Sequence, residues 1–276
     1  MSSQIQLNSV TLCCVDTRHT KQALQAIRAC MTHATFAEVL FFCTQEATDA
    51  AAVAGAHSDM AGIRHTPITP LRSIRDYSRF MLKELGRHVQ SEHALIIQWD
   101  GHISHPSLWD EHFLSWDYIG APWVYKNRPS EVGNGGFSLR SRALLQATMA
   151  LDWDGQEPED AAICRTLRPQ LENQFGLKVA PVGIAEKFSH EYGPFKASFG
   201  FHGMHNFAHR MQPEALQAWL QQAPEELLTH WHARNLIKQL ITAGRGREAR
   251  ALIRQRVGIR SWQMDDLGLW ARSIMA

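Results

Sequence analysis

Short apolar runs alternate with amphipathic segments in the first part of the chain. Each run is followed by a polar or turn-forming residue, which is typical of a strand buried on both faces. Apolar residues at helical spacing follow the first run, with Ala23, Ile27 and Cys30 on one face, and recur over 73–89. The predicted strands are 10–15, 38–43, 62–65 and 94–98, and 50–62 is expected to be a loop or a weak helix. This alternation predicts an α/β fold whose mixed, mostly parallel sheet is flanked by helices.

The pattern is less regular in the middle of the chain and becomes wholly helical towards its end. Segment 118–124 reads as a strand broken by Pro122, and 133–136 as a flexible glycine turn before a short strand. Helices are predicted at 141–150, 159–171, 213–222, 225–243 and 245–257, and a strand at 178–182. We therefore expect one domain over 1–205 and an all-helical, basic C-terminal region over 206–276.

Composition and charge exclude several classes of protein. The chain has 28 basic and 27 acidic side chains, so its formal charge of +1 argues against a nucleic-acid partner. It has no apolar stretch of the roughly 18 residues that a membrane span needs, and its start lacks the pattern of a signal peptide. The five cysteines form no C-x-x-C pair, and Cys13 and Cys43 lie in apolar runs. We expect buried thiols and a cytoplasmic protein.

The basic tail allows two interpretations. Segment 234–260 contains eight basic residues and one acid, Glu248. Helices of this kind can contact anionic membrane, which would place the protein peripherally on the inner face of the membrane. The alternative is ordinary packing onto the main domain, because one side of helix 245–257 is apolar. That apolar stripe is Ala249, Leu252, Ile253 and Val257.

Two carboxylates follow predicted strands, at Asp16 and Asp100. Open α/β sheets bind ligands at the carboxyl ends of their strands. Asp100 stands in the string Gln98-Trp99-Asp100-Gly101, where a carboxylate beside a glycine can hold a divalent cation and, through it, a diphosphate. A strand-ending aspartate also serves often as a turn residue.

Three further strings can carry chemistry, and each has a structural alternative. Glycines around Asn134 let a ligand approach the backbone or simply form a turn. Glu159 and Asp160 supply a catalytic base or merely complement a helix dipole. His202, between Phe201 and Gly203, offers a metal-binding imidazole or a packed core histidine.

Taken together and in order, these strings resemble one family. It is a family of microbial proteins of unknown function that is assigned to the GT-A glycosyltransferase-like folds, and the resemblance covers about 73–205. The matching strings are Gln98-Trp-Asp-Gly, Asp117-Tyr-Ile-Gly-Ala-Pro-Trp123, Gly133-Asn-Gly-Gly-Phe-Ser-Leu-Arg140, Glu159-Asp160, Phe188-Ser-x-Glu191 and Phe199-Gly-Phe-His-Gly203.

The resemblance implies transfer of a sugar from a nucleotide-sugar, with UDP as the nucleotide, to an acceptor hydroxyl. It implies inversion at the sugar, a glycan or lipid-linked acceptor, and a role in the synthesis of surface or secreted glycans. It also implies a divalent cation, Mn²⁺ or Mg²⁺. Gln98 replaces the first aspartate of the Asp-x-Asp motif, which leaves a second hypothesis open: a non-catalytic protein that binds nucleotide-sugar or glycan.

The site residues that the resemblance implies fall into four groups. The metal ligands are Asp100 and His202, and the catalytic base is Asp160 in the pair with Glu159. The nucleotide-sugar contacts are Val15, Asp16, Thr17, Gln98, Trp99 and Asp100. The sugar or acceptor contacts are Trp123, Asn134, Gly135 and Gly136.

Overall fold

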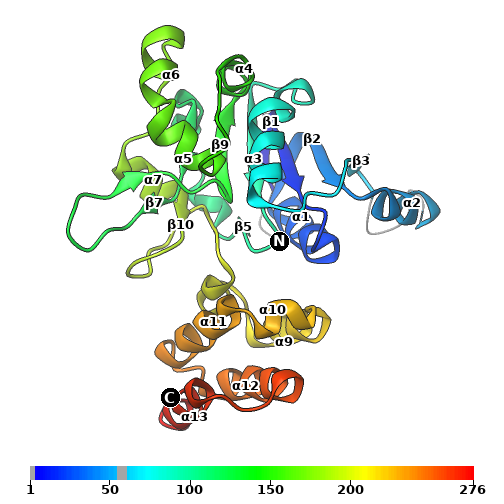
Figure 1. Ribbon diagram of the computed structural model, residues 1–276, viewed down its shortest axis with the longest axis vertical. Helices are drawn as coiled ribbons and strands as arrows, with labels where there is room; N and C mark the ends of the chain where they lie inside the picture. Colours follow the sequence, from blue (N-terminus) through cyan, green and yellow to red (C-terminus); the bar gives the residue numbers. More distant parts are fainter. Residues whose placement is uncertain (1–3, 55–60) are drawn as a thin grey trace. The chain divides into compact units, whose positions relative to one another are not determined.

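The computed structural model describes residues 4–54 and 61–276. The chain forms two compact units, Met1–His202 and Gly203–Ala276. The first is α/β and the second is helical (Figure 1). The boundary expected from the sequence lies a few residues further along, between 205 and 206.

A six-stranded sheet is the centre of the first unit (Figure 1). Its strands are β1 (Ile5–Val15), β2 (Ala34–Cys43), β3 (Arg64–Pro67), β4 (His93–Ile97), β6 (Tyr118–Gly120) and β9 (Phe137–Ser141). Their order is β3-β2-β1-β4-β9-β6. The first four run parallel, and β9 is antiparallel to both of its neighbours. The predicted mixed, mostly parallel sheet is confirmed.

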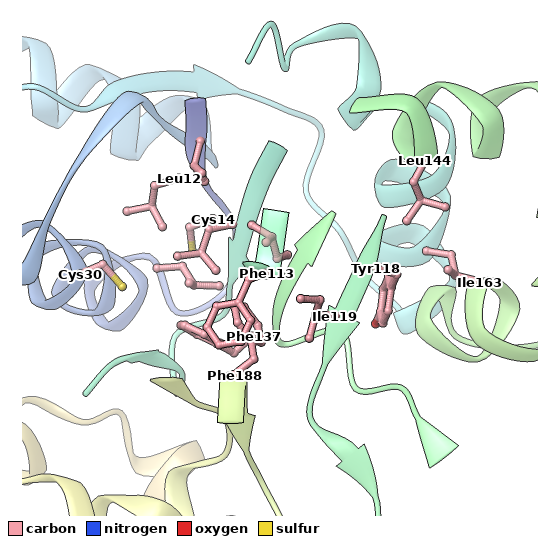
Figure 2. Packing of buried hydrophobic residues seen from close by; sticks show 14 of the residues in the cluster. Leu12, Cys14, Cys30, Phe113, Tyr118, Ile119, Phe137, Leu144, Ile163 and Phe188 are labelled. Carbon is pink, nitrogen blue, oxygen red and sulfur yellow. The ribbon is translucent and has the colours of Figure 1, made fainter. Parts of the chain in front are cut away.

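The second half of β1, residues 10–15, is buried on both faces, which explains its largely apolar sequence. Leu12 and Cys14 belong to the cluster that includes Cys30 of α1 (Thr20–His33). Cys13 and Val15 point the other way, into the cluster that includes Phe80 of α3 (Ile74–Lys83). Figure 2 shows part of the first cluster, including the rings of Phe113, Phe137 and Phe188. All five cysteines are buried and free, as predicted for Cys13 and Cys43.

Several helices follow the predicted pattern with altered ends. The amphipathic segment 73–89 forms α3, which begins after the Ser73 cap, and then the short η1 (Leu85–Arg87). The predicted helix 141–150 is α4 (Arg142–Ala150). The uncertain segment 50–62 begins inside α2 (Gln45–Ala54), and residues 55–60 lie outside the described residues.

Two predicted elements are wrong in the segment after residue 158. The expected helix 159–171 is divided into α5 (Glu159–Ala161), one wide turn η4 (Ala162–Thr166) and α6 (Arg168–Phe175). Pro169 lacks an N–H group and cannot continue a helix from the preceding turn. The expected strand 178–182 makes one bridge, between Val179 and Tyr118, before α7 (Val182–Phe188) begins.

Small sheets and turns surround the carboxyl edge of the large sheet. Segment 118–124 contributes both β6 and β7 (Pro122–Trp123), which pairs with β8 (Glu131–Val132), so the predicted break at Pro122 is confirmed. β10 (Ser189–His190), β11 (Gly200–Phe201) and β5 (His102–Ile103) form a three-stranded sheet. The turns η2 (Pro106–Leu108) and η3 (Glu111–Ser115) follow β5.

The second unit consists of helices. These are η5 (Met204–Asn206), α8 (Phe207–Arg210), α9 (Pro213–Gln222), α10 (Glu225–Thr229), α11 (Trp231–Thr242), α12 (Gly246–Arg260) and α13 (Met264–Ile274). The predicted helix 225–243 is two helices, because His230 is extended between them. Arg256 stabilises this break by donating to the carbonyls of Leu228 and His230 at 2.7 and 2.9 Å. α13 was not predicted from the sequence.

The apolar stripe of α12 packs inside the helical unit. Ala249, Leu252 and Ile253 are fully buried, and α12 contacts α10, α11 and α13. Next to the stripe, Arg256 is buried and faces the buried carboxylate of Asp266 at 3.4 Å. Across residues 4–54 and 61–276, every helix is too short or too polar to cross a bilayer.

Replacing Leu252 with alanine tests this packing. Leu252→Ala removes a fully buried side chain, so we expect the free energy of unfolding to fall by about 2–5 kcal/mol. The control is Leu267→Ala, whose side chain is half exposed on α13 and whose loss should cost less than about 1 kcal/mol. Urea unfolding followed by circular dichroism measures both, and equal losses would contradict the assignment of α12 as a core helix.

Candidate functional site

The candidate site lies where the strand order reverses, at the carboxyl ends of β1 and β4. β1 has β2 on one side and β4 on the other, so the loops that follow β1 and β4 leave the sheet beside each other. His19 and Trp99, one from each loop, have their rings 5.7 Å apart and nearly perpendicular. The two strand ends that the sequence singled out therefore meet.

The residues that follow β1 shape their own loop. Asp16 Oδ1 accepts from the backbone N–H groups of Arg18 and His19 at 2.7 and 2.6 Å. Thr17 Oγ1 accepts from the backbone of Leu71 at 2.9 Å, and the Val15 side chain is buried in the core. Burial raises the pKa of Asp16, the two N–H groups oppose the rise, and the Asp100 carboxylate adds to it.

The three-stranded sheet brings distant residues to the end of β4. β5 begins directly after the 98–101 turn, and its His102 pairs with Phe201 of β11. β10 pairs with the other side of β11, so that His190 lies beside Phe201. Glu191 and His202 each follow the last paired residue of their strand, and the His202 N–H donates to the His190 carbonyl at 3.0 Å. This register places His202 at the 98–101 turn and Glu191 beside His202.

His202 contacts three of these side chains through its two ring nitrogens. Nε2 lies 3.1 Å from Gln98 Oε1 and 3.2 Å from Asp100 Oδ1. Nδ1 lies 3.1 Å from Glu191 Oε1. Burial alone would lower the pKa of His202, but the carboxylates of Asp100 and Glu191 outweigh it and raise the pKa well above its ordinary value.

Asn134 continues this set of contacts. Its Nδ2 donates to Glu191 Oε2, and its Oδ1 accepts from the Gly136 N–H at 3.2 Å. The backbone of Asn134 has a positive φ of 43°, a conformation that asparagine tolerates better than most residues. Both ends of the buried amide are thus engaged within the protein. We call Asn134, Glu191 and His202 the histidine-positioning chain.

The glycines beside Asn134 allow side chains to approach the backbone closely. A Cβ atom on Gly136 would stand 2.2 Å from His202 Nε2, and one on Gly135 would stand 2.3 Å from Glu159 Oε1. Both distances are far below a permitted contact, so only glycine fits at these positions. The glycine run is therefore a packed surface on which His202 and Glu159 lie.

Glu159 and Asp160 have different surroundings although they are adjacent. Glu159 Oε1 accepts from Arg140 Nη2 at 2.9 Å, and both side chains are almost wholly buried. Asp160 is half-buried and its Oδ2 accepts from the Gly135 N–H at 3.1 Å. The ion pair thus engages Glu159, whereas Asp160 accepts from the backbone N–H groups of Gly135 and Ala161.

The two tryptophans make contacts within the protein. Trp123 is partly buried against Gly133, with the Arg165 guanidinium 4.3 Å from its ring centre. Trp99 is also partly buried and packs on the core. Of the residues singled out in the sequence, Gln98, Asp100 and His202 are in direct contact, and Asn134, Gly135, Gly136, Glu159 and Asp160 join them through the glycine run.

Two residues of this arrangement were missed by the sequence reasoning. Glu191 and Arg140 stand inside strings that resemble the family, but no role was assigned to them. The sequence carried a signal for each, because a charged residue in or next to a buried strand, such as Glu191 or Arg140, requires a partner. Which partners they have depends on the fold.

The donor atoms around His202 Nε2 suit a divalent cation. Mg²⁺ takes oxygen ligands in an octahedron with bonds of about 2.1 Å, which separates neighbouring ligand atoms by about 3 Å. The distances of 3.1 and 3.2 Å from Nε2 to the oxygens of Gln98 and Asp100 match this spacing. A cation that replaces the Nε2 proton would meet an amide oxygen, a carboxylate and an imidazole, while Glu191 keeps hold of Nδ1.

The set contains one negative charge, on Asp100. Among the described residues, no group of three or more His, Cys, Asp or Glu side chains is arranged to hold a metal. The three side chains around His202 Nε2 agree with this finding, because one of them is the amide of Gln98.

Replacing Glu159 with glutamine tests the assignment of its ion pair. Glu159→Gln leaves the buried Arg140 guanidinium without a countercharge, so we expect the free energy of unfolding to fall by about 3 kcal/mol or more. The control is Glu172→Gln, which removes an exposed ion pair with Arg168 and should cost less than about 1 kcal/mol. If urea unfolding gave the two variants the same stability, the buried pair would not support the site.

Solved structures with a similar arrangement share little sequence with this chain. A glycosyltransferase involved in glycosylation of the major capsid of PBCV-1 is 10% identical, with 70% of this chain and 91% of that chain covered and a TM-score of 0.42. S. aureus TarS 1–349 in complex with UDP is 11% identical (95% and 88% covered, TM-score 0.39). The 4-diphosphocytidyl-2C-methyl-D-erythritol synthase from Anaerococcus prevotii DSM 20548 is 10% identical (62% and 86% covered, TM-score 0.38). No curated protein matches the sequence.

A protein family matches the part of the chain that contains most of the site. The match covers residues 61–202, which is just over half of the chain. It includes Gln98, Asp100, the glycine run, Asp160 and the histidine-positioning chain, and it ends with the first compact unit. The chain therefore belongs to the family described as "Protein of unknown function (DUF5672)".

Proposed function

We propose that the protein is a glycosyltransferase that moves a sugar from a nucleotide-sugar, with UDP as the nucleotide, to an acceptor hydroxyl with inversion. One observation carries the proposal. Segments that are distant in sequence, at Gln98–Asp100, Asn134–Gly136, Asp160 and His202, gather at the carboxyl edge of one sheet. These are the positions to which the resemblance assigned cation, sugar and base.

The nucleotide diphosphate binds where β1 and β4 end. Gln98, Asp100 and His202 would hold Mn²⁺ or Mg²⁺ there, which would supply positive charge against the negative charge of the leaving diphosphate. The loops at Asp16–Thr17 and at Trp99 contact the nucleoside in this proposal, and the proximity of their His19 and Trp99 rings supports it. Because Asp100 is the one carboxylate among these three residues, it would neutralise only part of the charge of a divalent cation. The remaining positive charge would attract the diphosphate.

Asp160 is the base of the proposed reaction. The acceptor oxygen attacks the anomeric carbon of the sugar, its proton passes to the Asp160 carboxylate, and the bond from that carbon to the diphosphate oxygen breaks. The Gly135 N–H holds the carboxylate in place at 3.1 Å. Glu159 positions Asp160 indirectly, because its ion pair with Arg140 fixes the start of α5.

The histidine-positioning chain orients the cation ligand. A carboxylate on Nδ1 fixes the tautomer and the ring orientation of a metal-binding histidine. Glu191 takes that place, and Asn134 fixes Glu191. In this proposal Asn134 acts on the cation site through Glu191, whereas the sequence suggested a direct contact with sugar or acceptor. Three expectations from the sequence stay predictions. They are a glycan or lipid-linked acceptor in the synthesis of a surface or secreted glycan, a cytoplasmic location, and the lack of a nucleic-acid partner.

Calorimetric titration with UDP and with GDP, each with and without Mn²⁺, tests the nucleotide site. We expect UDP to bind in a Mn²⁺-dependent manner, and Asp100→Asn to weaken that binding by at least about tenfold, because the only charged oxygen ligand is lost. Asp152→Asn, on an exposed aspartate, is the control and should bind as the wild type does. Equal binding of UDP by Asp100→Asn would remove Asp100 from the site.

Release of UDP from a panel of UDP-sugars tests the base. We expect Asp160→Asn to keep the affinity for UDP and to slow sugar transfer, to an acceptor or to water, by about 10²–10⁴-fold, since proton removal is lost. Undiminished turnover by Asp160→Asn would place the base elsewhere. Tight binding of UDP-sugars by the wild type with no turnover of any of them would favour the non-catalytic binding protein.

A further inference from the structure

The outward face of α13 in the helical unit is apolar. Asp266, Leu269 and Ser273 form its buried side. Successive residues of an α-helix are turned by about 100°, so the opposite side collects positions three, four and seven apart. Met264, Leu267 and Ile274 stand there with 84%, 51% and 65% of their surface exposed. This is the reverse of an ordinary surface helix, whose outer side is polar.

Tryptophans extend this face to the turn before the helix. Trp262 is 46% exposed, and its ring lies 5.8 Å from that of Trp270, nearly perpendicular to it. Ile259, at the end of α12, is also exposed. We call Ile259, Trp262, Met264, Leu267, Trp270 and Ile274 the α13 face.

Arginines border the α13 face on both sides. The Arg254 guanidinium lies 5.1 Å from the centre of the Trp270 ring, at one edge. Arg272 is exposed on α13 itself, at a helical position beside the opposite edge. Segment 203–276 carries ten basic and six acidic side chains, and the exposed Asp265 is paired with Arg234 at 2.8 Å. The apolar strip thus has an arginine at each of its two edges.

An apolar strip bordered by arginines favours one kind of binding partner over another. A second copy of the chain would set one arginine-bordered strip against another, and like charges would oppose the contact. An anionic lipid surface complements both parts, because apolar side chains enter the acyl boundary while arginines meet phosphate groups. Tryptophan is enriched at that depth of a bilayer. The eleven residues of α13 are far fewer than the ~20 of a membrane span.

We propose that the α13 face docks the protein on an anionic phospholipid surface, with the helix lying in the plane of the membrane. The sequence suggested the basic helices over 234–260 for such a contact, but three residues of the apolar stripe of α12, Ala249, Leu252 and Ile253, are buried. The docking helix is therefore the one after it. This inference is independent of the proposed glycosyltransferase chemistry.

Co-sedimentation of the full-length protein with vesicles tests the docking. The probes are vesicles of phosphatidylcholine alone and of phosphatidylcholine with phosphatidylglycerol. We expect binding to the anionic vesicles only, weaker at higher salt, with a shift of tryptophan fluorescence to shorter wavelength. The double variants Leu267→Ser/Ile274→Ser and Arg254→Gln/Arg272→Gln should each lower the affinity by about tenfold or more.

A matched control separates docking from general surface effects. Ile74 is 67% exposed on α3, in the other unit, so Ile74→Ser should leave vesicle binding unchanged. Circular dichroism establishes that each variant is folded. Absence of binding to anionic vesicles, or equal binding by all variants, would overturn the proposal. So would a concentration-dependent dimer that Leu267→Ser/Ile274→Ser dissociates, because a second copy would then cover the face.

Discussion

The pairing of β11 with β5 is the constraint on which the candidate site depends. Two residue pairs, Phe201 with His102 and Gly200 with Ile103, fix where His202 stands relative to the end of β4. β10 adds Glu191 on the other side of the same histidine. A shift of one residue in this register would turn both side chains to the other face. The geometry of the proposed cation site is therefore set by backbone hydrogen bonds rather than by its own side chains.

The need to satisfy buried polar groups explains the residues around this pairing. A buried charge without a partner destabilises the folded state. Arg140 and Glu159 form a buried ion pair, and Asn134 donates a hydrogen bond to Glu191. These contacts need the backbone to come within a side chain's reach, which the close approaches at Gly135 and Gly136 provide. The string that contains the glycines thus combines three functions: it orders the polar network, supports His202 and positions Asp160.

The sequence predicted the parts of the fold that depend on local pattern. Strands β1, β2 and β4 were evident because both of their faces are apolar, and Asp16 and Asp100 were evident as strand ends. What escaped depends on tertiary contacts. Arg256 holds open the break at His230, Pro169 interrupts a helix that periodicity favoured, and Arg140 engages Glu159. Arg256 and Arg140 are distant in sequence from His230 and Glu159, the residues that they contact. Pro169 lies inside the predicted helix, but the helical spacing of the apolar residues around it favoured a continuous helix.

Diffraction from crystals grown with Mn²⁺ and UDP, recorded where manganese scatters anomalously, tests the central claim most directly. We expect one manganese peak at the carboxyl end of β4, bound by Gln98 Oε1, Asp100 Oδ1 and His202 Nε2, with Glu191 still on Nδ1 and the diphosphate also bound to the ion. A diphosphate bound at another edge of the sheet, or manganese held by residues other than these three, would contradict it.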